Sequence, residues 1–301
     1  MSDNNSLQTA IEAFESVSKT PVHFINKLGS GTGNDVFLIN WMYVYRIKLE
    51  NKVDGQFNKP RSELMVIQAL AGDPRSPMPR VMSFDGNTGN KCEEYVSSGT
   101  TLSQIQDREE RFQAYCNVLF AMKQLHSITG PFDTFQVHER FDFYKMMSGQ
   151  KIRIDYEKRL RREAEDIIAQ DRVVLCHNDL WEGNIVLAQG EELRECYLID
   201  YEFAANNAEI FDLASFLEEN EIPYDVSKRL INRYYGAKNV TETTVKNVFK
   251  VMEYLDLFWY YWAYARYQET LREDFLQISK KKFKRVNRNL KRWSDSACDG
   301  E

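Results

Sequence analysis

The pattern of apolar residues changes near residue 97, and this change restricts the possible folds more than any other feature of the chain. Before it, clusters of β-branched and aromatic residues predict short strands at residues 22–28, 36–40 and 42–49, near Val81, and at 92–96. After it, apolar residues recur mostly at helical spacing. We therefore expect an α+β fold with two lobes, a small β-rich lobe over residues 1–97 and a larger, mainly helical lobe over residues 98–301.

Helical periodicity also predicts the elements around these strands. A leading amphipathic helix is expected over residues 7–17, and a second helix begins near Pro60 and carries Glu63. In the larger lobe the pattern predicts helices over residues 112–125, 140–170 and 211–292, the last with one break at Ile222 and Pro223. Short strands are expected between loops at residues 172–176, 185–188 and 196–199.

The composition limits the partners that such a chain can have. Of 301 residues, 43% are hydrophobic and 28% are charged, which is typical of a globular protein, and the net charge is −6. A net acidic chain is poorly suited to binding nucleic acid, and no apolar run reaches the about 18 residues that indicate a transmembrane helix. Residues 1–7 lack the order of a signal peptide, and five scattered cysteines without a CxxC pair indicate neither a disulfide scaffold nor a zinc site. We expect a cytoplasmic protein.

The segment 177–184, with the sequence HNDLWEGN, carries the most informative pattern of polar residues. Transfer of a phosphoryl group from a nucleotide requires a carboxylate that deprotonates the acceptor hydroxyl, and oxygen ligands that hold Mg²⁺ against the phosphates. Asp179 and Asn184, at D-x-x-x-x-N spacing, could supply an acid and an amide from one loop, and Asp200 ends an apolar strand farther along. The catalytic loop of protein kinases has the same order of residues. The alternative, an acidic turn capped by Asp179, explains none of this ordered spacing.

The stretches HNDLWEGNIVL, YLIDYEF and FDLASF resemble the choline/ethanolamine kinase family, within the wider aminoglycoside-phosphotransferase and protein-kinase-like superfamily. The similarity is greatest to the bacterial choline kinases and runs in order from about Leu28 to Phe283. This resemblance implies a protein-kinase-like fold. It also implies that ATP and Mg²⁺ are used to phosphorylate the hydroxyl of choline, a small-molecule substrate, to give phosphocholine.

The resemblance also implies a role for each residue of the motif. Asp179 would be the catalytic base, while Asn184 and Asp200 would bind Mg²⁺. His177 would brace the catalytic loop without reacting. Asp212, in the sequence FDLA, would accept hydrogen bonds from the loop backbone and serve a structural role.

The glycine-rich stretch 29–34, with the sequence GSGTGN, joins the first two predicted strands. Backbone N–H groups in such a turn can surround phosphates, and glycine allows a close approach. The family carries a similar loop, in which Gly31 and Asn34 match but Gly33 replaces a hydroxyl residue. A plain hairpin turn is the alternative, because glycine-rich turns are common.

Arg46 stands on the strand where a protein kinase keeps its phosphate-binding lysine, and choline kinases resemble this chain in using arginine there. Arginine can clamp a phosphate through two donors, and Glu63 on the next helix would pair with it. The alternative is a strand with alternating charges, which suits Lys48 better than Arg46 between its apolar neighbours. Glu94 and Val96 resemble the hinge that offers backbone groups to adenine, although any edge strand would have a similar sequence.

Asp256, Trp259 and Trp262 share one face of a predicted helix. Two indoles attract a quaternary ammonium through their faces, and a nearby carboxylate adds complementary charge. The family has the same W-x-x-W pattern at its choline site, which implies that these three residues bind substrate. Phe203 matches another aromatic residue of that site, and Glu202 could be a substrate contact or a second acid near the metal. The alternative is that the aromatic stripe belongs to the core.

Several alternatives for the function stay open. Ethanolamine or another small amino alcohol could be the acceptor, although the indole pair favours choline because a primary ammonium needs hydrogen-bond acceptors as well. An aminoglycoside would require a site lined by acids. A non-catalytic binding protein with the same fold is the remaining alternative, against which the intact Asp179, Asn184 and Asp200 argue. The sequence leaves open the oligomeric state and whether Trp181 and Phe275 line the substrate site.

Overall fold

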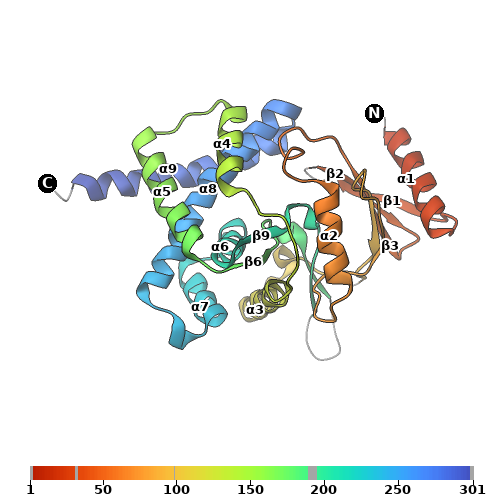
Figure 1. Ribbon diagram of the computed structural model, residues 1–301, viewed down its shortest axis with the longest axis horizontal. Helices are drawn as coiled ribbons and strands as arrows, with labels where there is room; N and C mark the ends of the chain where they lie inside the picture. Colours follow the sequence, from red (N-terminus) through yellow and green to blue (C-terminus); the bar gives the residue numbers. More distant parts are fainter. Residues whose placement is uncertain (1–2, 31–32, 98, 189–194, 299–301) are drawn as a thin grey trace. The chain divides into compact units, whose positions relative to one another are not determined.

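The computed structural model describes residues 3–30, 33–97, 99–188 and 195–298, which fold into two compact units (Figure 1). The sheet unit comprises Met1–Asn51, Asn58–Asp133 and Glu182–Ala205. The helical unit comprises Lys52–Phe57, Thr134–Trp181 and Asn206–Glu301. Two segments thus belong to the other unit from their neighbours in the sequence. Residues 52–57 belong to the helical unit, and residues 182–205 belong to the sheet unit.

The sheet unit is built on a five-stranded antiparallel sheet with the strand order β1-β2-β3-β5-β4. Its strands are β1 (Ile25–Ser30), β2 (Asn34–Ile39), β3 (Tyr43–Lys48), β4 (Val81–Phe84) and β5 (Lys91–Glu94). A separate hairpin consists of β7 (Ile185–Ala188) and β8 (Glu195–Leu198). The helices of this unit are α1 (Asp3–Ser18), α2 (Pro60–Ala71) and α3 (Arg108–His126), with short 3₁₀ turns η1 (Leu102–Gln104), η2 (Glu182–Asn184) and η3 (Tyr201–Phe203).

The five-stranded sheet lies between α1 and α2 (Figure 1). On one face, Phe14 of α1 packs in an apolar cluster with Phe37 and Tyr45. Because side chains alternate along a strand, Arg46 points to the opposite face from Tyr45, where it meets Glu63 of α2. The period of the strand thus separates an apolar face from a charged one.

The helical unit surrounds an aromatic core. Phe258 lies at its centre, with its ring centroid 5.0 Å from that of Trp259 and 5.3 Å from that of Tyr144. Its elements are α4 (Val137–Ser148), α5 (Ile154–Gln170), β6 (Val173–Cys176), β9 (Ala205–Ala208), α6 (Glu209–Glu219), α7 (Tyr224–Tyr235), η4 (Ala237–Asn239), α8 (Glu242–Thr270) and α9 (Glu273–Cys298). Strands β6 and β9 pair, and α9 packs along α8. Across the described residues, we find no helix that combines the length and the apolar character needed to cross a bilayer.

The structure differs from the predicted elements in three places: two predicted helices are interrupted, and one strand was not predicted. The predicted helix over residues 140–170 is interrupted after α4, because Gly149 adopts φ 63° and ends the helix. The predicted helix over residues 211–292 has two further breaks, at Gly236 with φ 81° and at Leu271 with φ 55°. Strand β9 was not predicted, because the sequence ANNA lacks the β-branched residues that usually indicate a strand.

Candidate active site

Arg46 is the centre of a buried ionic arrangement in the sheet unit. Its Nη2 lies 2.8 Å from Oε2 of Glu63, and its Nη1 lies 2.7 Å from Oδ1 of Asp200. Nη2 also donates to the carbonyl of Gly89 at 2.8 Å. Burial disfavours the guanidinium charge, but Glu63 and then Asp200 outweigh this effect and hold the pKa of Arg46 above its ordinary value. The predicted pairing of Arg46 with Glu63 is confirmed, and the pair fixes the guanidinium beside Asp200.

Asp200 and Asn184 lie together at one end of the β7–β8 hairpin. Ile185 pairs with Leu198, and the N–H of Ile199 donates to the carbonyl of Asn184 at 3.0 Å. Asp200 follows directly with φ 64°, a conformation that residues other than glycine rarely adopt. A carboxylate and a side-chain amide oxygen are the hard ligands that Mg²⁺ prefers, so this pair fits Mg²⁺ chemically. Asn34 adds a hydrogen bond from its Nδ2 to Oδ2 of Asp200 at 3.3 Å.

Glu202, two residues after Asp200, forms a second ion pair with the sheet. Its Oε2 lies 3.3 Å from Nζ of Lys48 on β3. Burial, and then the charge of Asp200, raises the pKa of Glu202 to about 7. Phe203, the next residue, is buried in the same 3₁₀ turn. Both residues belong to the sheet unit, whereas the predicted tryptophan pair belongs to the helical unit.

The other predicted nucleotide contacts lie at or just beyond the end of β5, or outside the described residues. Glu94 ends β5, where its N–H donates to the carbonyl of Arg80 and its side chain forms an exposed ion pair with Arg80 at 3.5 Å. Val96 is half-buried beyond the end of β5. Gly31 lies outside the described residues. The roles of Glu94, Val96 and Gly31 in nucleotide binding stay predictions.

The segment that carries Asp179 is held by Asp212 in the first turn of α6. The N–H of His177 donates to Oδ2 of Asp212, and the N–H of Asn178 donates to Oδ1, both at 2.7 Å. All three residues are fully buried. Asn178 has φ 65°, which turns the chain sharply just before Asp179. The prediction that Asp212 binds the loop backbone is therefore confirmed.

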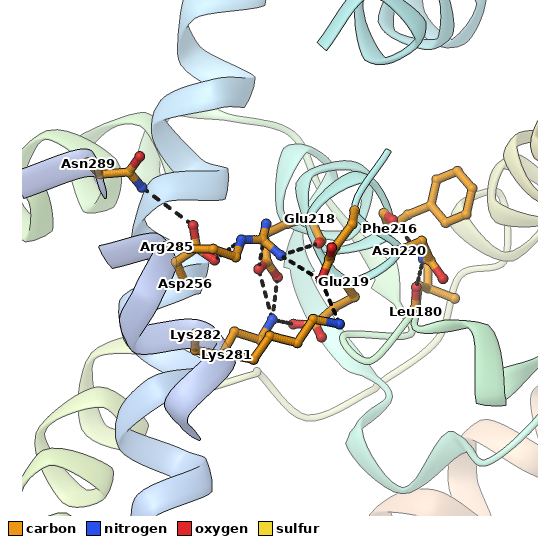
Figure 2. Close-up of polar contacts among 11 residues, drawn as sticks. Leu180, Phe216, Glu218, Glu219, Asn220, Asp256, Lys281, Lys282, Arg285 and Asn289 are labelled. Carbon is orange, nitrogen blue, oxygen red and sulfur yellow. Dashed lines mark hydrogen bonds and ion pairs between the residues drawn. The ribbon is translucent and has the colours of Figure 1, made fainter. Parts of the chain in front are cut away.

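Asn220, at the other end of α6, holds the residue that follows Asp179. Its Nδ2 donates to the carbonyl of Leu180 at 2.9 Å and to that of Phe216 at 2.7 Å (Figure 2). Helix α6 thus binds the chain on both sides of Asp179, whose own side chain is half-buried. We did not predict Asn220, because an asparagine just after a helix is ordinarily only a C-terminal cap.

A buried ion cluster joins the end of α6 to α9 (Figure 2). Nζ of Lys282 lies 2.8 Å from Oε2 of Glu218 and 2.7 Å from Oε1 of Glu219, and Nη2 of Arg285 lies 2.9 Å from Oε1 of Glu218. The side chain of Glu218 is fully buried. A buried carboxylate requires such partners, because an unpaired charge away from water is costly. The cluster therefore anchors the end of α6 next to Asn220.

Asp256 belongs to this cluster. Its Oδ1 lies 2.7 Å from Nε of Arg285, and its Oδ2 accepts a 3.4 Å hydrogen bond from Asn289. Burial, and then the negative charge of Glu218, raises the pKa of Asp256 to about 9. Its contacts thus lie with α9, and its role in substrate binding stays a prediction.

The two tryptophans of α8 form a buried edge-to-face pair. The ring centroids of Trp259 and Trp262 are 5.5 Å apart with an interplanar angle of 87°, and only 5% and 9% of the two residues are exposed. Phe275 of α9 packs edge-on against Trp262, at 5.7 Å and 80°. Trp181, in contrast, is 44% exposed. The structure thus groups Phe275 with the tryptophan pair in one aromatic cluster.

Asp54 supplies a carboxylate to this aromatic cluster that sequence reasoning missed. Nε1–H of Trp262 donates to both of its oxygens, at 3.1 and 3.0 Å, and the hydroxyl of Tyr144 donates to Oδ1 at 2.8 Å. Asp54 is only 3% exposed. In the sequence it precedes Gly55, and an Asp-Gly pair ordinarily signals a turn.

Comparisons with known proteins show the family of this chain and agree with its fold. A choline/ethanolamine kinase family model matches residues 25–242. The protein LicA of Haemophilus influenzae is 26% identical over 164 residues, which are 52% of this chain and 59% of LicA, so the match spans little more than half of that relative.

Solved structures extend the likeness in fold to nearly the whole chain. The choline kinase LicA of Streptococcus pneumoniae superposes with a TM-score of 0.72 at 19% identity, over 94% of this chain and 99% of that one. The GDP complex of an aminoglycoside 2′-phosphotransferase superposes with a TM-score of 0.70 at 12% identity, over 95% of this chain and 98% of that one. The predicted protein-kinase-like fold is therefore confirmed. Because the family model matches well over half of the chain, this protein belongs to the choline/ethanolamine kinase family.

Proposed function

We propose that this protein transfers the γ-phosphoryl group of ATP to the hydroxyl of choline and releases phosphocholine and ADP. Its family consists of phosphotransferases, and the choice of choline as acceptor is the proposal. The observation that carries it is the buried indole pair of Trp259 and Trp262 on α8. Two indole rings in a dry environment suit a quaternary ammonium, which has no N–H to donate and binds through its charge alone.

Asp179 is the proposed general base. Its backbone is held on both sides by α6, through Asp212 and Asn220, so the carboxylate has a defined position. A half-buried carboxylate in such a position can accept the proton of the choline hydroxyl as the oxygen attacks phosphorus. Most of the acceleration then comes from placement, because phosphoryl transfer asks little covalent chemistry of the protein.

The sheet unit supplies the proposed phosphate contacts. Arg46 is oriented by Glu63, and its guanidinium charge suits phosphate oxygens. Asn34, whose side chain donates to Asp200, and Gly31 complete the proposed phosphate contacts. Asn184 and Asp200 would hold Mg²⁺, which neutralises the negative charge that develops on the phosphates. In the proposal, Glu94 and Val96 offer backbone groups to adenine.

The decisive experiment is release of ADP from ATP in the presence of Mg²⁺ with choline, ethanolamine or an aminoglycoside at equal concentration. We expect the largest stimulation with choline. A larger stimulation with ethanolamine or the aminoglycoside would contradict the choice of acceptor. No stimulation by any of the three, with nucleotide still bound, would favour a non-catalytic binding protein instead.

Asp179→Asn is the matched control for this assay. Asparagine has nearly the same size but cannot accept the hydroxyl proton, so we expect kcat to fall by a factor on the order of 10²–10⁴ while nucleotide still binds. Unchanged turnover in this variant would contradict the assignment of the base. Together the two measurements separate the question of the acceptor from the question of the catalytic residue.

A further inference from the structure

The segment Lys52–Phe57 lies between β3 and α2 in the sequence, yet it belongs to the helical unit. The N–H of Lys52 donates to Oε1 of Glu269 near the end of α8 at 2.6 Å. At the other end, the ring of Phe57 packs edge-on against Phe143 of α4, with centroids 5.7 Å apart. Val53 and Asp54 between them are buried. The segment is therefore attached to both α4 and α8.

Asp54 is the point where this segment reaches the aromatic cluster. Both of its carboxylate oxygens lie within 3.1 Å of Nε1 of Trp262, and Tyr144 of α4 donates to Oδ1 at 2.8 Å. Hydrogen bonds to a charged acceptor are stronger than those between neutral groups, and burial removes the competition from water. The carboxylate therefore restrains the plane of the Trp262 indole.

The orientation of that plane matters for binding a cation. An aromatic ring attracts a cation over its face, which carries partial negative charge. The edge of the ring carries partial positive charge and repels a cation. Trp259 and Phe275 pack against Trp262 at angles of 87° and 80°, and Asp54 binds the N–H at the edge of the same indole. The hydrogen bond to Asp54 therefore adds a polar restraint to the packing that holds the face of the ring.

We propose that Asp54 is a positioning residue of the acceptor site, which orients Trp262 for a quaternary ammonium and brings a negative charge to the edge of that indole. The proposal rests on the function proposed above. It extends the acceptor site to the segment 52–57, far in the sequence from α8 and α9. Asp54 acts through Trp262 and touches no reacting atom.

The test compares steady-state kinetics of three variants with the wild-type protein. Asp54→Ala removes the acceptor, so the KM for choline should rise roughly tenfold or more while the KM for ATP changes little. Asp54→Asn keeps the volume and one acceptor oxygen, so it should recover part of this loss. Tyr144→Phe removes the hydroxyl that donates to the same carboxylate and accepts from Arg140, while the bond from Trp262 to Asp54 is kept, so the KM for choline should change less than about twofold. Equal increases in the KM for choline and for ATP in Asp54→Ala would overturn the proposal.

A double-mutant cycle tests whether Asp54 acts through Trp262. In a Trp262→Phe background, which lacks the indole N–H, Asp54→Ala should add less than about a twofold change to the KM for choline. An undiminished effect in that background would overturn the proposal. If the Asp54→Ala variant does not fold, Asp54→Asn replaces it in the same double-mutant cycle.

A spectroscopic measurement separates failure of this proposal from failure of the proposed function. The chain has 5 tryptophans, so indole N–H signals are few in an NMR spectrum, and Trp262→Phe identifies the one that disappears. Asp54→Asn should shift that signal and leave those of distant tryptophans in place. An unshifted signal overturns the role of Asp54 for any acceptor. A shifted signal in a protein that does not phosphorylate choline would contradict the choice of choline and leave the link between Asp54 and Trp262 supported.

Discussion

Asp212→Asn is the substitution that most directly tests how α6 holds the segment around Asp179. The wild-type carboxylate accepts one hydrogen bond from the N–H of His177 and one from that of Asn178, both at 2.7 Å. An asparagine amide has almost the same shape but only one oxygen, so its NH₂ group faces one of the two donors. One buried backbone N–H then loses its acceptor, at or next to Asn178, whose φ is positive.

The expected magnitude follows from these contacts. A hydrogen bond to a charged group contributes about 1.5–3 kcal/mol, and a buried N–H without an acceptor costs about 1–3 kcal/mol. Because one acceptor oxygen remains, we expect Asp212→Asn to lower the free energy of unfolding by about 2–4 kcal/mol. That is less than the about 5–15 kcal/mol that stabilise a typical domain, so the variant should still fold. A displaced loop should also lower kcat, since a shift of about 1 Å at a catalytic group can reduce the rate roughly 10²-fold.

The assay pairs urea unfolding, followed by circular dichroism, with ADP release under saturating ATP and choline. Asp179→Asn is the control, because it should leave the free energy of unfolding within about 0.5 kcal/mol of the wild type and lower kcat alone. Asp212→Asn should change both quantities. An unfolding free energy close to that of the wild type, or a normal kcat, would refute the idea that Asp212 maintains the conformation of this segment.

Three further predictions concern the rest of the site. Trp259→Ala should raise the KM for choline far more than the KM for ATP, with the exposed Trp41→Ala as a control; equal effects on both constants would return α8 to a purely structural role. Glu63→Gln should leave the buried guanidinium of Arg46 with one charged partner fewer, so that unfolding requires about 3 kcal/mol less and the KM for ATP rises; an unchanged thermal midpoint would contradict this. Asp256 has a pKa raised to about 9, so the folded protein retains a proton that the unfolded chain releases, and its contribution to stability falls as pH rises from about 4 to 9. Asp256→Asn removes this dependence, and its thermal midpoint should improve relative to the wild type between pH 5 and 9; parallel pH profiles would show that Asp256 does not bind this proton.

Local patterns in the sequence are sufficient for much of the fold and part of the candidate site. The alternation of β3 indicates that Tyr45 and Arg46 face opposite sides of the sheet, because successive side chains of a strand point in opposite directions. The hydrogen bonds from the segment before Asp179 to Asp212 agree with what the resemblance to the kinase family implied for the FDLA motif. In each case the relevant information lies within a few residues or in a recurring motif.

Element boundaries and polar partners depended on contacts that no local pattern contains. Leu271 ends α8 with φ 55°, although leucine favours helices, because the chain must turn there for α9 to pack along α8. Helical spacing predicts Asp256 on the tryptophan face, whereas its partners in the structure, Arg285 and Asn289, come from the following helix. Spacing along one helix states which residues share a face, but not which neighbouring element covers it.

Patterns in the sequence were enough to predict a loop with the residue order of the protein kinases, an arginine with a carboxylate partner and two tryptophans on one helical face. Only the folded chain shows that Asp54 binds Trp262, 208 residues farther along, and that Asn220 binds the carbonyl of Leu180. The physical reason is that each of these hydrogen bonds joins side chains whose approach is set by packing of whole helices, and a pattern of a few residues carries no information about that packing.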